Sequence, residues 1–200
     1  TEDASNVLTL STSYTDVAGN AGPTATTSNY AIDTLVPTAA ITYNSASPYK
    51  NGETIIITAT FSEAMASTPV PQIAIAGSGI VNVGATPMTF SSTTVYTYSY
   101  VVPTGDGTGT ISLSTGTDPA GNVITSTPTS GTTFTVDNTA PTVSSFVLSD
   151  IALKDGETST VTLTFSEAVA GFSSDADITA VNGTLSTMTT SDNIIWSGIF

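Results

Sequence analysis

Cysteine and histidine are absent from all 200 residues of the chain. Disulfide bonds, zinc sites built from these residues and catalysis by a cysteine or histidine side chain are therefore excluded. No apolar run approaches the roughly 20 residues of a membrane-spanning helix, and no signal peptide opens the chain. Residue 1 is therefore expected to lie inside a longer polypeptide, and no direct membrane insertion is expected.

Basic residues are nearly as scarce. The only basic residues are Lys50 and Lys154, and the chain has 16 Asp and Glu residues, which gives a formal net charge of −14. Nucleic-acid binding is not expected, because it needs basic patches. An acidic chain repels itself unless cations screen or bind it. The charge balance therefore favours a protein that binds cations.

Charged residues make up only 9% of the chain, and Thr and Ser supply the polarity instead. This composition argues against a charge-rich disordered tail. It fits short β-strands, because β-branched side chains suit a pleated surface and lose rotamer freedom in helices. No stretch shows a convincing helical period. The sequence therefore predicts an all-β fold.

An internal repeat organises the chain. "KNGETIIITATFSEAM" (50–65) matches "KDGETSTVTLTFSEAV" (154–169) at a spacing of 104 residues, and "TDVAGN" (15–20) matches "TDPAGN" (117–122) at 102. Repeats of this kind indicate tandem domains. We predict a complete repeat over 34–137, the last two strands (F and G) of a preceding repeat over 1–33, and the first strands (A to E) of a following repeat over 138–200.

The complete repeat shows strand patterns separated by Gly and Pro. About seven short antiparallel strands in about 100 residues are typical of an immunoglobulin-like Greek-key β-sandwich. Tandem sandwiches of this type are the predicted fold. In the immunoglobulin lettering A to G, the expected strands are 39–43, 54–61, 72–76, 80–90, 94–102, 110–115 and 133–136.

Four oxygen-bearing side chains are expected at one pole of this sandwich. Asp33 lies in the incoming linker, Glu63 begins the B–C loop, and Asp118 and Asn122 lie in the F–G loop. Because strands alternate in direction, this topology brings the three segments together. Carboxylates without Lys or Arg nearby repel one another unless a cation bridges them. Oxygen-only ligands on flexible loops suit Ca²⁺.

The repeat predicts further calcium ligands at the neighbouring junctions. Asp137, Glu167 and Asp177 are expected at the following junction, where Asn138 and Asp175 are additional candidates. Asp16 belongs to the preceding one. The alternative is turn chemistry alone, since "DPAGN" and "KNGE" form good turns without a metal. Asp106, Asp150, Asp155 and Asp192 are read as solvated turn residues.

Four segments carry a family resemblance: "KDGETSTVTLTFSEAV", "ADITAVNGTLS", "TDPAGN" and "VDNTAPT". They resemble the bacterial immunoglobulin-like (BIg) tandem repeats of large surface adhesins and biofilm-associated proteins. The resemblance implies an extracellular or surface-anchored protein, with calcium at domain junctions in several relatives. Such arrays serve as stalks or as fibre material. The middle repeat lacks the aspartates of "SSDADI", which makes the following repeat the stronger calcium candidate.

The predicted function is therefore a non-enzymatic extension module of a bacterial surface adhesin or extracellular fibre, whose partners are neighbouring repeats. Alternatives are a carbohydrate- or protein-binding module, or an accessory domain of a secreted polysaccharide-active enzyme. Self-assembly is a further possibility, in which one subunit's F and G strands complete another's sandwich. Tyr96, Tyr98 and Tyr100 share one strand face, where core packing is favoured over a sugar platform. Trp196 is expected in the core of its unit.

Overall fold

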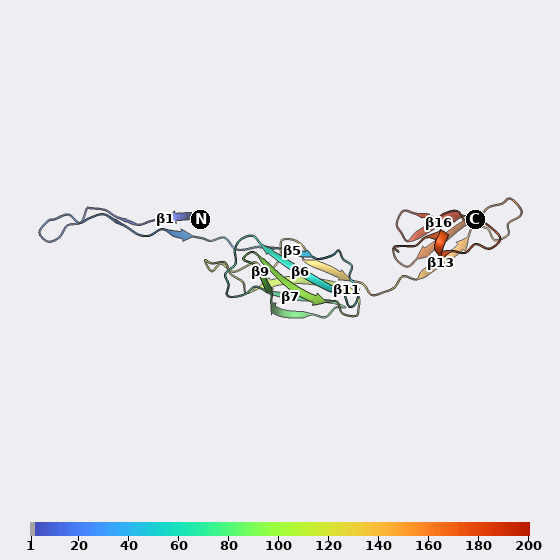
Figure 1. Ribbon diagram of the computed structural model, residues 1–200, viewed down its shortest axis with the longest axis horizontal. Helices are drawn as coiled ribbons and strands as arrows, with labels where there is room; N and C mark the ends of the chain where they lie inside the picture. The colour runs from blue at the N-terminus through green and yellow to red at the C-terminus, as the bar shows by residue number, and fades with distance from the viewer. Residues whose placement is uncertain (1–2) are drawn as a thin grey trace. The chain divides into compact units, whose positions relative to one another are not determined.

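The computed structural model describes residues 3–200 (Figure 1). The chain consists of two compact units, Thr1–Asn138 and Thr139–Phe200. Residues 1 and 2 of the predicted segment 1–33 lie outside the described residues. The first unit holds a complete β-sandwich preceded by a long hairpin. The second unit holds one sheet.

The sandwich of the first unit consists of two antiparallel sheets, which confirms the predicted all-β, immunoglobulin-like class. One sheet has the order β5-β6-β10-β9, and the other has the order β12-β11-β7-β8. The strands of the first sheet are β5 (Ala39–Tyr43), β6 (Thr54–Phe61), β9 (Thr89–Ser92) and β10 (Val95–Val101). Those of the second are β7 (Gln72–Ser78), β8 (Val83–Pro87), β11 (Gly107–Ser114) and β12 (Thr133–Val136).

The sandwich has eight strands, where the sequence predicts about seven. The predicted strand 80–90 forms two strands, β8 on one sheet and β9 on the other. Pro87 ends β8, since proline has no N–H for the ladder. Met88 then crosses between the sheets, with its side chain buried and its N–H donating to the carbonyl of Pro71 at 2.9 Å. A buried crossing of this kind leaves both short strands paired.

Strand alternation builds the core of the sandwich. In β6 the side chains of Ile55, Ile57, Ala59 and Phe61 are buried, and the residues between them point away from the core. The facing sheet contributes buried residues by the same alternation, namely Ile73, Ile75, Ile111, Leu113, Phe134 and Val136. Tyr96 and Tyr100 are buried and Tyr98 packs against the core. The prediction that this tyrosine face packs in the core is therefore confirmed.

The hairpin at the start of the chain (blue in Figure 1) pairs β1 (Asp3–Asn6) with β4 (Tyr30–Ile32), and β2 (Thr9–Leu10) with β3 (Ala25–Thr26). Its register matches that of the β11–β12 hairpin at one end and shifts by one residue between Asp3 and Asn6. Asp3 opposes Ile32 as Gly107 opposes Val136. The bridge between Thr15 and Ala21 likewise corresponds to the bridge between Thr117 and Val123. The hairpin therefore has the pairing of strands F and G, but its residues are largely exposed.

The second unit has one antiparallel sheet with the order β13-β14-β16-β15. Its strands are β13 (Val143–Leu148), β14 (Thr160–Phe165), β15 (Thr189–Thr190) and β16 (Ile195–Ile199). Val161, Leu163 and Met188 form its core, and Trp196 packs against them and lies 4.9 Å from Phe172 between ring centroids. The predicted core position of Trp196 is confirmed.

A one-turn helix, α1 (Ser174–Asp177), lies between β14 and β15 where the sequence shows no helical period. A local ring of hydrogen bonds explains it. The Asp177 carboxylate accepts from the N–H of Ser173 at 2.9 Å, and the carbonyl of Ser173 accepts from the N–H of Asp177 at 2.8 Å. One such turn needs no hydrophobic periodicity, which is why the sequence pattern does not reveal it.

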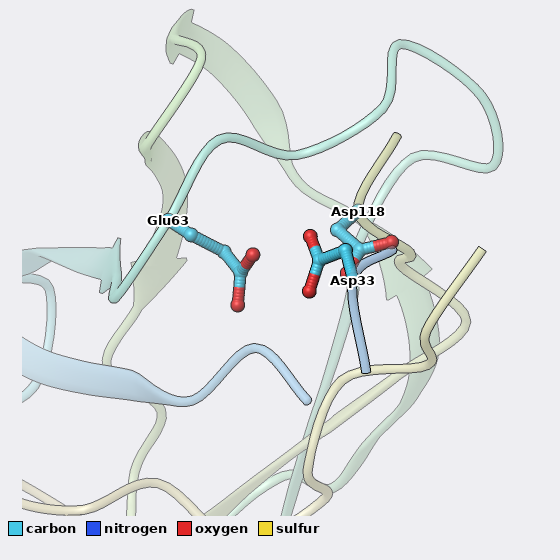
Figure 2. A group of neighbouring side chains, drawn as sticks. All are labelled: Asp33, Glu63 and Asp118. Carbon is cyan, nitrogen blue, oxygen red and sulfur yellow. The ribbon is translucent and has the colours of Figure 1, made fainter. Parts of the chain in front are cut away.

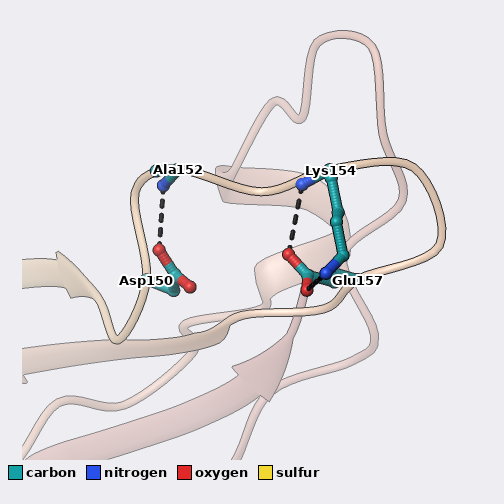
Figure 3. Close-up of polar contacts among 4 residues, drawn as sticks. All are labelled: Asp150, Ala152, Lys154 and Glu157. Carbon is teal, nitrogen blue, oxygen red and sulfur yellow. Dashed lines mark hydrogen bonds and ion pairs between the residues drawn. The ribbon is translucent and has the colours of Figure 1, made fainter.

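Both lysines begin equivalent A–B turns. In the second unit the Lys154 ammonium contacts the Glu157 carboxylate at 2.9 Å and the Lys154 N–H donates to it at 3.2 Å (Figure 3). The Lys50 N–H donates to Glu53 at 3.2 Å in the same way. Gly52 and Gly156 have φ angles of 85° and 82°, as turn glycines require. The eight-residue strand β6 separates Lys50 from the loop that carries Glu63.

Candidate metal centre

Three carboxylates from distant segments converge at one pole of the sandwich. Asp33 lies ahead of β5, Glu63 follows the end of β6, and Asp118 lies in the loop between β11 and β12. One oxygen of each lies within 4.8 Å of the other two, and the Glu63 side chain points toward the aspartates (Figure 2). The group forms in the middle repeat, which the sequence predicts to be the weaker calcium candidate.

Two reciprocal hydrogen bonds join the incoming linker to the B–C loop. The Thr38 N–H donates to the Ser62 hydroxyl at 3.0 Å, and the Ser62 N–H donates to the carbonyl of Thr38 at 2.8 Å. The second unit repeats this pair with Thr142 and Ser166, at 2.9 Å and 2.8 Å. The reciprocal pair fixes the chain on both sides of the site. The repeated "PT" and "FSEA" motifs carry this signal in the sequence.

Asp118 is the most buried member of the group, at 1% exposure. One of its oxygens accepts from the N–H groups of Gly121 and Asn122 at 2.7 and 2.9 Å. The other accepts from the Asn122 side-chain amide at 2.7 Å. The same amide donates to the carbonyl of Asp33 at 3.2 Å. Asn122 therefore donates through its side-chain nitrogen to the Asp118 carboxylate and to the main chain of Asp33, whereas the sequence suggests it as an oxygen ligand.

The loop around Asp16 has similar internal hydrogen bonds. Asp16 accepts from the N–H groups of Ala18 and Asn20, both at 2.9 Å, and from the Asn20 amide at 2.8 Å. Among residues 3–200, however, Asp16 belongs to no carboxylate group of the kind formed by Asp118. The loop therefore adopts this conformation without a neighbouring carboxylate group among residues 3–200. What distinguishes the Asp118 loop is the approach of Asp33 and Glu63.

Two opposing effects act on the pKa of Asp118. Burial raises it, while hydrogen bonds from the Asn122 side chain and from the backbone of Asn122 and Gly121 lower it. The hydrogen bonds outweigh burial, so the pKa lies below its ordinary value of 3.8. Asp118 is therefore held as a carboxylate at neutral pH. An ionised group in this position is available to a cation.

The lowered pKa of Asp118 predicts a loss of stability in acid. A group whose folded pKa is depressed stabilises the fold fully above its unfolded pKa and loses that contribution as pH falls through its folded pKa. Unfolding temperatures measured in chelator are therefore expected to fall as pH drops below 3.8. The Asp118→Asn variant should show a smaller acid-dependent decrease. Asp155→Asn, in an exposed turn, is the matched control and should follow the unchanged chain.

The donor chemistry of the group fits a hard cation. All three side chains offer carboxylate oxygens, and the whole sequence holds only two basic residues, both at A–B turns. Ca²⁺ takes six to eight oxygens, usually carboxylates, carbonyls and water. The three carboxylates would supply part of such a shell. Mg²⁺ demands stricter octahedral geometry and retains more water, so this loop-borne set suits Ca²⁺ better.

The remaining predicted ligands are divided between the two units. Asp137 belongs to the first unit, and Glu167 and Asp177 belong to the second. Asp177 is exposed and bonded to Ser173 within α1, and Asp175 accepts from the Thr187 hydroxyl at 3.0 Å. Asp16 is exposed in the hairpin. A calcium site at either neighbouring junction stays a prediction.

Asn138 has a role that the sequence does not reveal. Its side-chain oxygen accepts from the N–H of Asn51, its amide donates to the carbonyl of Gly105, and its own N–H donates to the Asp106 carboxylate. These bonds tie the outgoing chain to the A–B and E–F turns. Asp106 therefore positions the linker, in addition to forming a turn. Thr34 occupies the equivalent position one repeat earlier, so comparison of the repeats does not predict the role of Asn138.

The two packed antiparallel sheets of the first unit, with carboxylates where the incoming chain meets them, define an immunoglobulin-like β-sandwich module. Residues 137–200 match the family described as "Bacterial Ig-like domain", which confirms the predicted resemblance for that segment. No match was found among curated proteins or among solved structures. Over residues 3–200, no helix has the length and hydrophobicity needed to cross a membrane.

Proposed function

We propose that the chain is a structural extension module of a bacterial surface adhesin or extracellular fibre, and that it acts without catalysis. In this proposal Asp33, Glu63 and Asp118 hold Ca²⁺ where the incoming chain meets the sandwich. The observation that carries the proposal is their convergence within 4.8 Å from three segments. The bound ion would fix a segment that otherwise depends on a few hydrogen bonds.

The match of residues 137–200 to a bacterial immunoglobulin-like family supports the module. The internal repeat supports a tandem arrangement, in which neighbouring repeats of the same chain are the partners. The tyrosines that could have formed a sugar platform are committed to the core. By repeat symmetry, Asp137, Glu167 and Asp177 are proposed to serve the next junction, and Asp16 the preceding one.

A bound Ca²⁺ would stabilise the folded state in two ways. Extracellular modules bind Ca²⁺ with dissociation constants of about 10⁻⁴ to 10⁻³ M. At ten times the dissociation constant, mass action stabilises the folded state by roughly 1.4 kcal/mol. The two positive charges of Ca²⁺ also reduce the mutual repulsion of the three neighbouring carboxylates. The stabilisation per site is modest, but repetition along an array would stiffen each junction.

Calcium is expected to raise the unfolding temperature of the first sandwich by roughly 5 to 10 °C at saturation, since 1 kcal/mol corresponds to roughly 4 to 8 °C in a domain of this size. Far-UV circular dichroism of the full chain in millimolar Ca²⁺ and in chelator measures this shift. Glu63→Gln should abolish the shift, because it removes one charged ligand and keeps the side-chain size. Asp155→Asn is the control and should retain it.

The proposal fails if chelator and calcium give the same unfolding temperature for the unchanged chain. It also fails if Glu63→Gln shifts as far as the unchanged chain, because the calcium effect would then arise elsewhere on this acidic surface. Mg²⁺ at the same concentration separates specific binding from general charge screening. A smaller shift with Mg²⁺ is expected.

A further inference from the structure

One side of the complete sandwich is closed and the opposite side is open. On the closed side, Ala40 bridges to Ser130 and Tyr49 bridges to Val136, which joins the edge of the first sheet to β12 of the second. On the open side, β8 and β9 each end their sheet, and among residues 3–200 each pairs with a strand on one side only. Every second residue of an edge strand turns its N–H and C=O groups away from its partner. The open side is therefore a template for a further strand.

Of the two open edges, β9 has fewer of the features that prevent further pairing. Charged side chains, proline and bulges are the usual protections of an edge strand. β8 ends at Pro87, which cannot donate a hydrogen bond to a further strand. β9 contains neither proline nor a charged residue. Its four residues, and the register shift that skips Ser91 in the pairing with β10, limit how much strand can be added.

Phe90 lies within β9 and is 60% exposed. Its ring packs edge-on against that of Tyr96, with 5.6 Å between the centroids. Tyr96 is 1% exposed, so Phe90 extends the core of the sandwich to the surface at the open edge. A strand added beside β9 would cover part of the exposed ring, and burial of apolar surface favours association.

The open side of the sandwich carries no charge. The sequence from 64 to 105, which forms β7 to β10, contains none of the 16 acidic residues and neither of the two basic ones. All charged residues of the sandwich lie in linkers and turns outside its eight strands, among them Asp33, Glu63 and Asp118 at the candidate metal centre. Two copies of a chain with a net charge of −14 therefore repel each other least where their open edges meet.

We propose that β9 of one chain pairs with β9 of a second copy, so that the first sheets of two sandwiches become one continuous sheet. A second copy fits as the occupant because it brings the same uncharged edge and the same exposed ring. A basic partner would find no opposite charge on this side, and an acidic one would gain no attraction. The two strands would run antiparallel, since a two-fold axis then lets the N–H groups of each face the C=O groups of the other.

This inference goes beyond the proposed function, because it joins separate chains side by side and does not involve the calcium site. A four-residue edge forms a small contact, at the weak end of specific interfaces. Repeated contacts between two tandem arrays would add to one another, since each further contact forms within a pair that is already associated. The bundling of arrays rests on the proposed tandem arrangement, whereas the pairing of β9 does not.

The experiment uses the full ¹⁵N-labelled chain in chelator, followed by NMR at concentrations up to about 1 mM, where weak contacts form. Concentration-dependent shifts are expected at the amides of Thr89–Ser92. Ser91→Glu should weaken association at least about tenfold, because charge on an edge strand opposes pairing. Ser112→Glu makes the same change at an exposed position of β11 and is the matched control, which should associate like the unchanged chain.

A second pair of variants tests the aromatic contact without adding charge. Phe90→Ser removes the exposed ring and should also weaken association about tenfold. Val101→Ser, at a position of β10 that is 64% exposed, is its control and should have no such effect. Circular dichroism shows whether each variant is folded, and Ser91→Glu decides the question if Phe90→Ser unfolds the sandwich.

A spin label tests which strands meet. Because the chain has no cysteine, a nitroxide can be attached at a single introduced one. An unlabelled chain that carries the nitroxide through Ser92→Cys is mixed with the ¹⁵N-labelled chain. The amides of Thr89–Ser92 in the labelled chain should broaden more than any others. A nitroxide attached through Ser112→Cys should leave them sharp.

A spectrum that does not change with concentration up to about 1 mM would overturn the proposal and leave the edge to an unlike partner or to none. Association that survives Ser91→Glu would also overturn it, as would broadening centred on another strand, because the contact would then use a different surface. Chelator is present throughout, so none of these outcomes depends on calcium binding. The pairing and the calcium site can therefore fail separately.

Discussion

Phe134→Ala is expected to lower the free energy of unfolding of the first sandwich by about 3 to 5 kcal/mol, the usual loss for a buried phenylalanine. The Phe134 ring contacts the rings of Tyr43, Tyr49 and Tyr100 at centroid distances of 6.0, 6.2 and 5.6 Å. Gly109 lies beside it, so close that an added Cβ would come within 2.5 Å of the ring. A glycine cannot fill the resulting cavity, which places the cost high in this range.

Urea unfolding followed by far-UV circular dichroism measures this loss. Trp196, the chain's single tryptophan, lies in the second unit and reports on that unit by fluorescence. We expect its transition to stay in place while the transition of the first sandwich shifts. Val101→Ala, at an exposed position of β10, should change stability by roughly 0.5 kcal/mol or less. A loss as small as this for Phe134→Ala would contradict the described core.

Completing the second unit within one chain is expected to stabilise it by about 3 to 5 kcal/mol. The test chain carries copies of residues 101–106 and then 3–33 after Phe200, because 101–106 form the link that the first sandwich uses before β11. Each buried apolar side chain, such as Phe146 or Tyr30, contributes about 1.5 to 3 kcal/mol. Ordering the added hairpin offsets part of this gain.

Trp196 fluorescence measures the change in the second unit directly. Its unfolding midpoint should move to higher urea concentration, because the hairpin would cover apolar residues of the sheet such as Phe146 and Leu148, which are 54% and 43% exposed. The matched control carries the same addition with Asp at the copied positions of Tyr30 and Ile32, and should behave like the unextended chain. An unchanged midpoint for the extended chain would show that the hairpin does not complete the sheet of the second unit.

Much of the first sandwich could be predicted because its strands alternate strictly. Strands 39–43, 54–61 and 133–136 have the predicted bounds, since buried and exposed residues alternate in each. The split of β8 from β9 could not be predicted, because the buried crossing at Met88 depends on tertiary contacts. The α1 turn also escaped prediction, since it arises from one side chain, Asp177, closing a local ring.

The candidate site could be predicted in part. Antiparallel topology is enough to place Asp33, Glu63 and Asp118 at one pole, because each follows or precedes a strand whose direction is known. The donor role of Asn122 and the clamp at Asn138 depend on side-chain orientation, which a sequence pattern does not contain. The Asp16 loop shows the limit most clearly. Its motif and most of its hydrogen bonds match those of Asp118, yet among residues 3–200 only the Asp118 loop has carboxylate neighbours.

The most direct test of the calcium site is a Ca²⁺ titration of the ¹⁵N-labelled chain followed by NMR. We predict saturable shifts centred on the amides of Asp33, Glu63, Gly121 and Asn122, with a dissociation constant of about 10⁻⁴ to 10⁻³ M, and their loss in Glu63→Gln. Small shifts spread over all acidic surfaces without saturation would contradict the account. They would show that the three carboxylates are turn residues and surface charge.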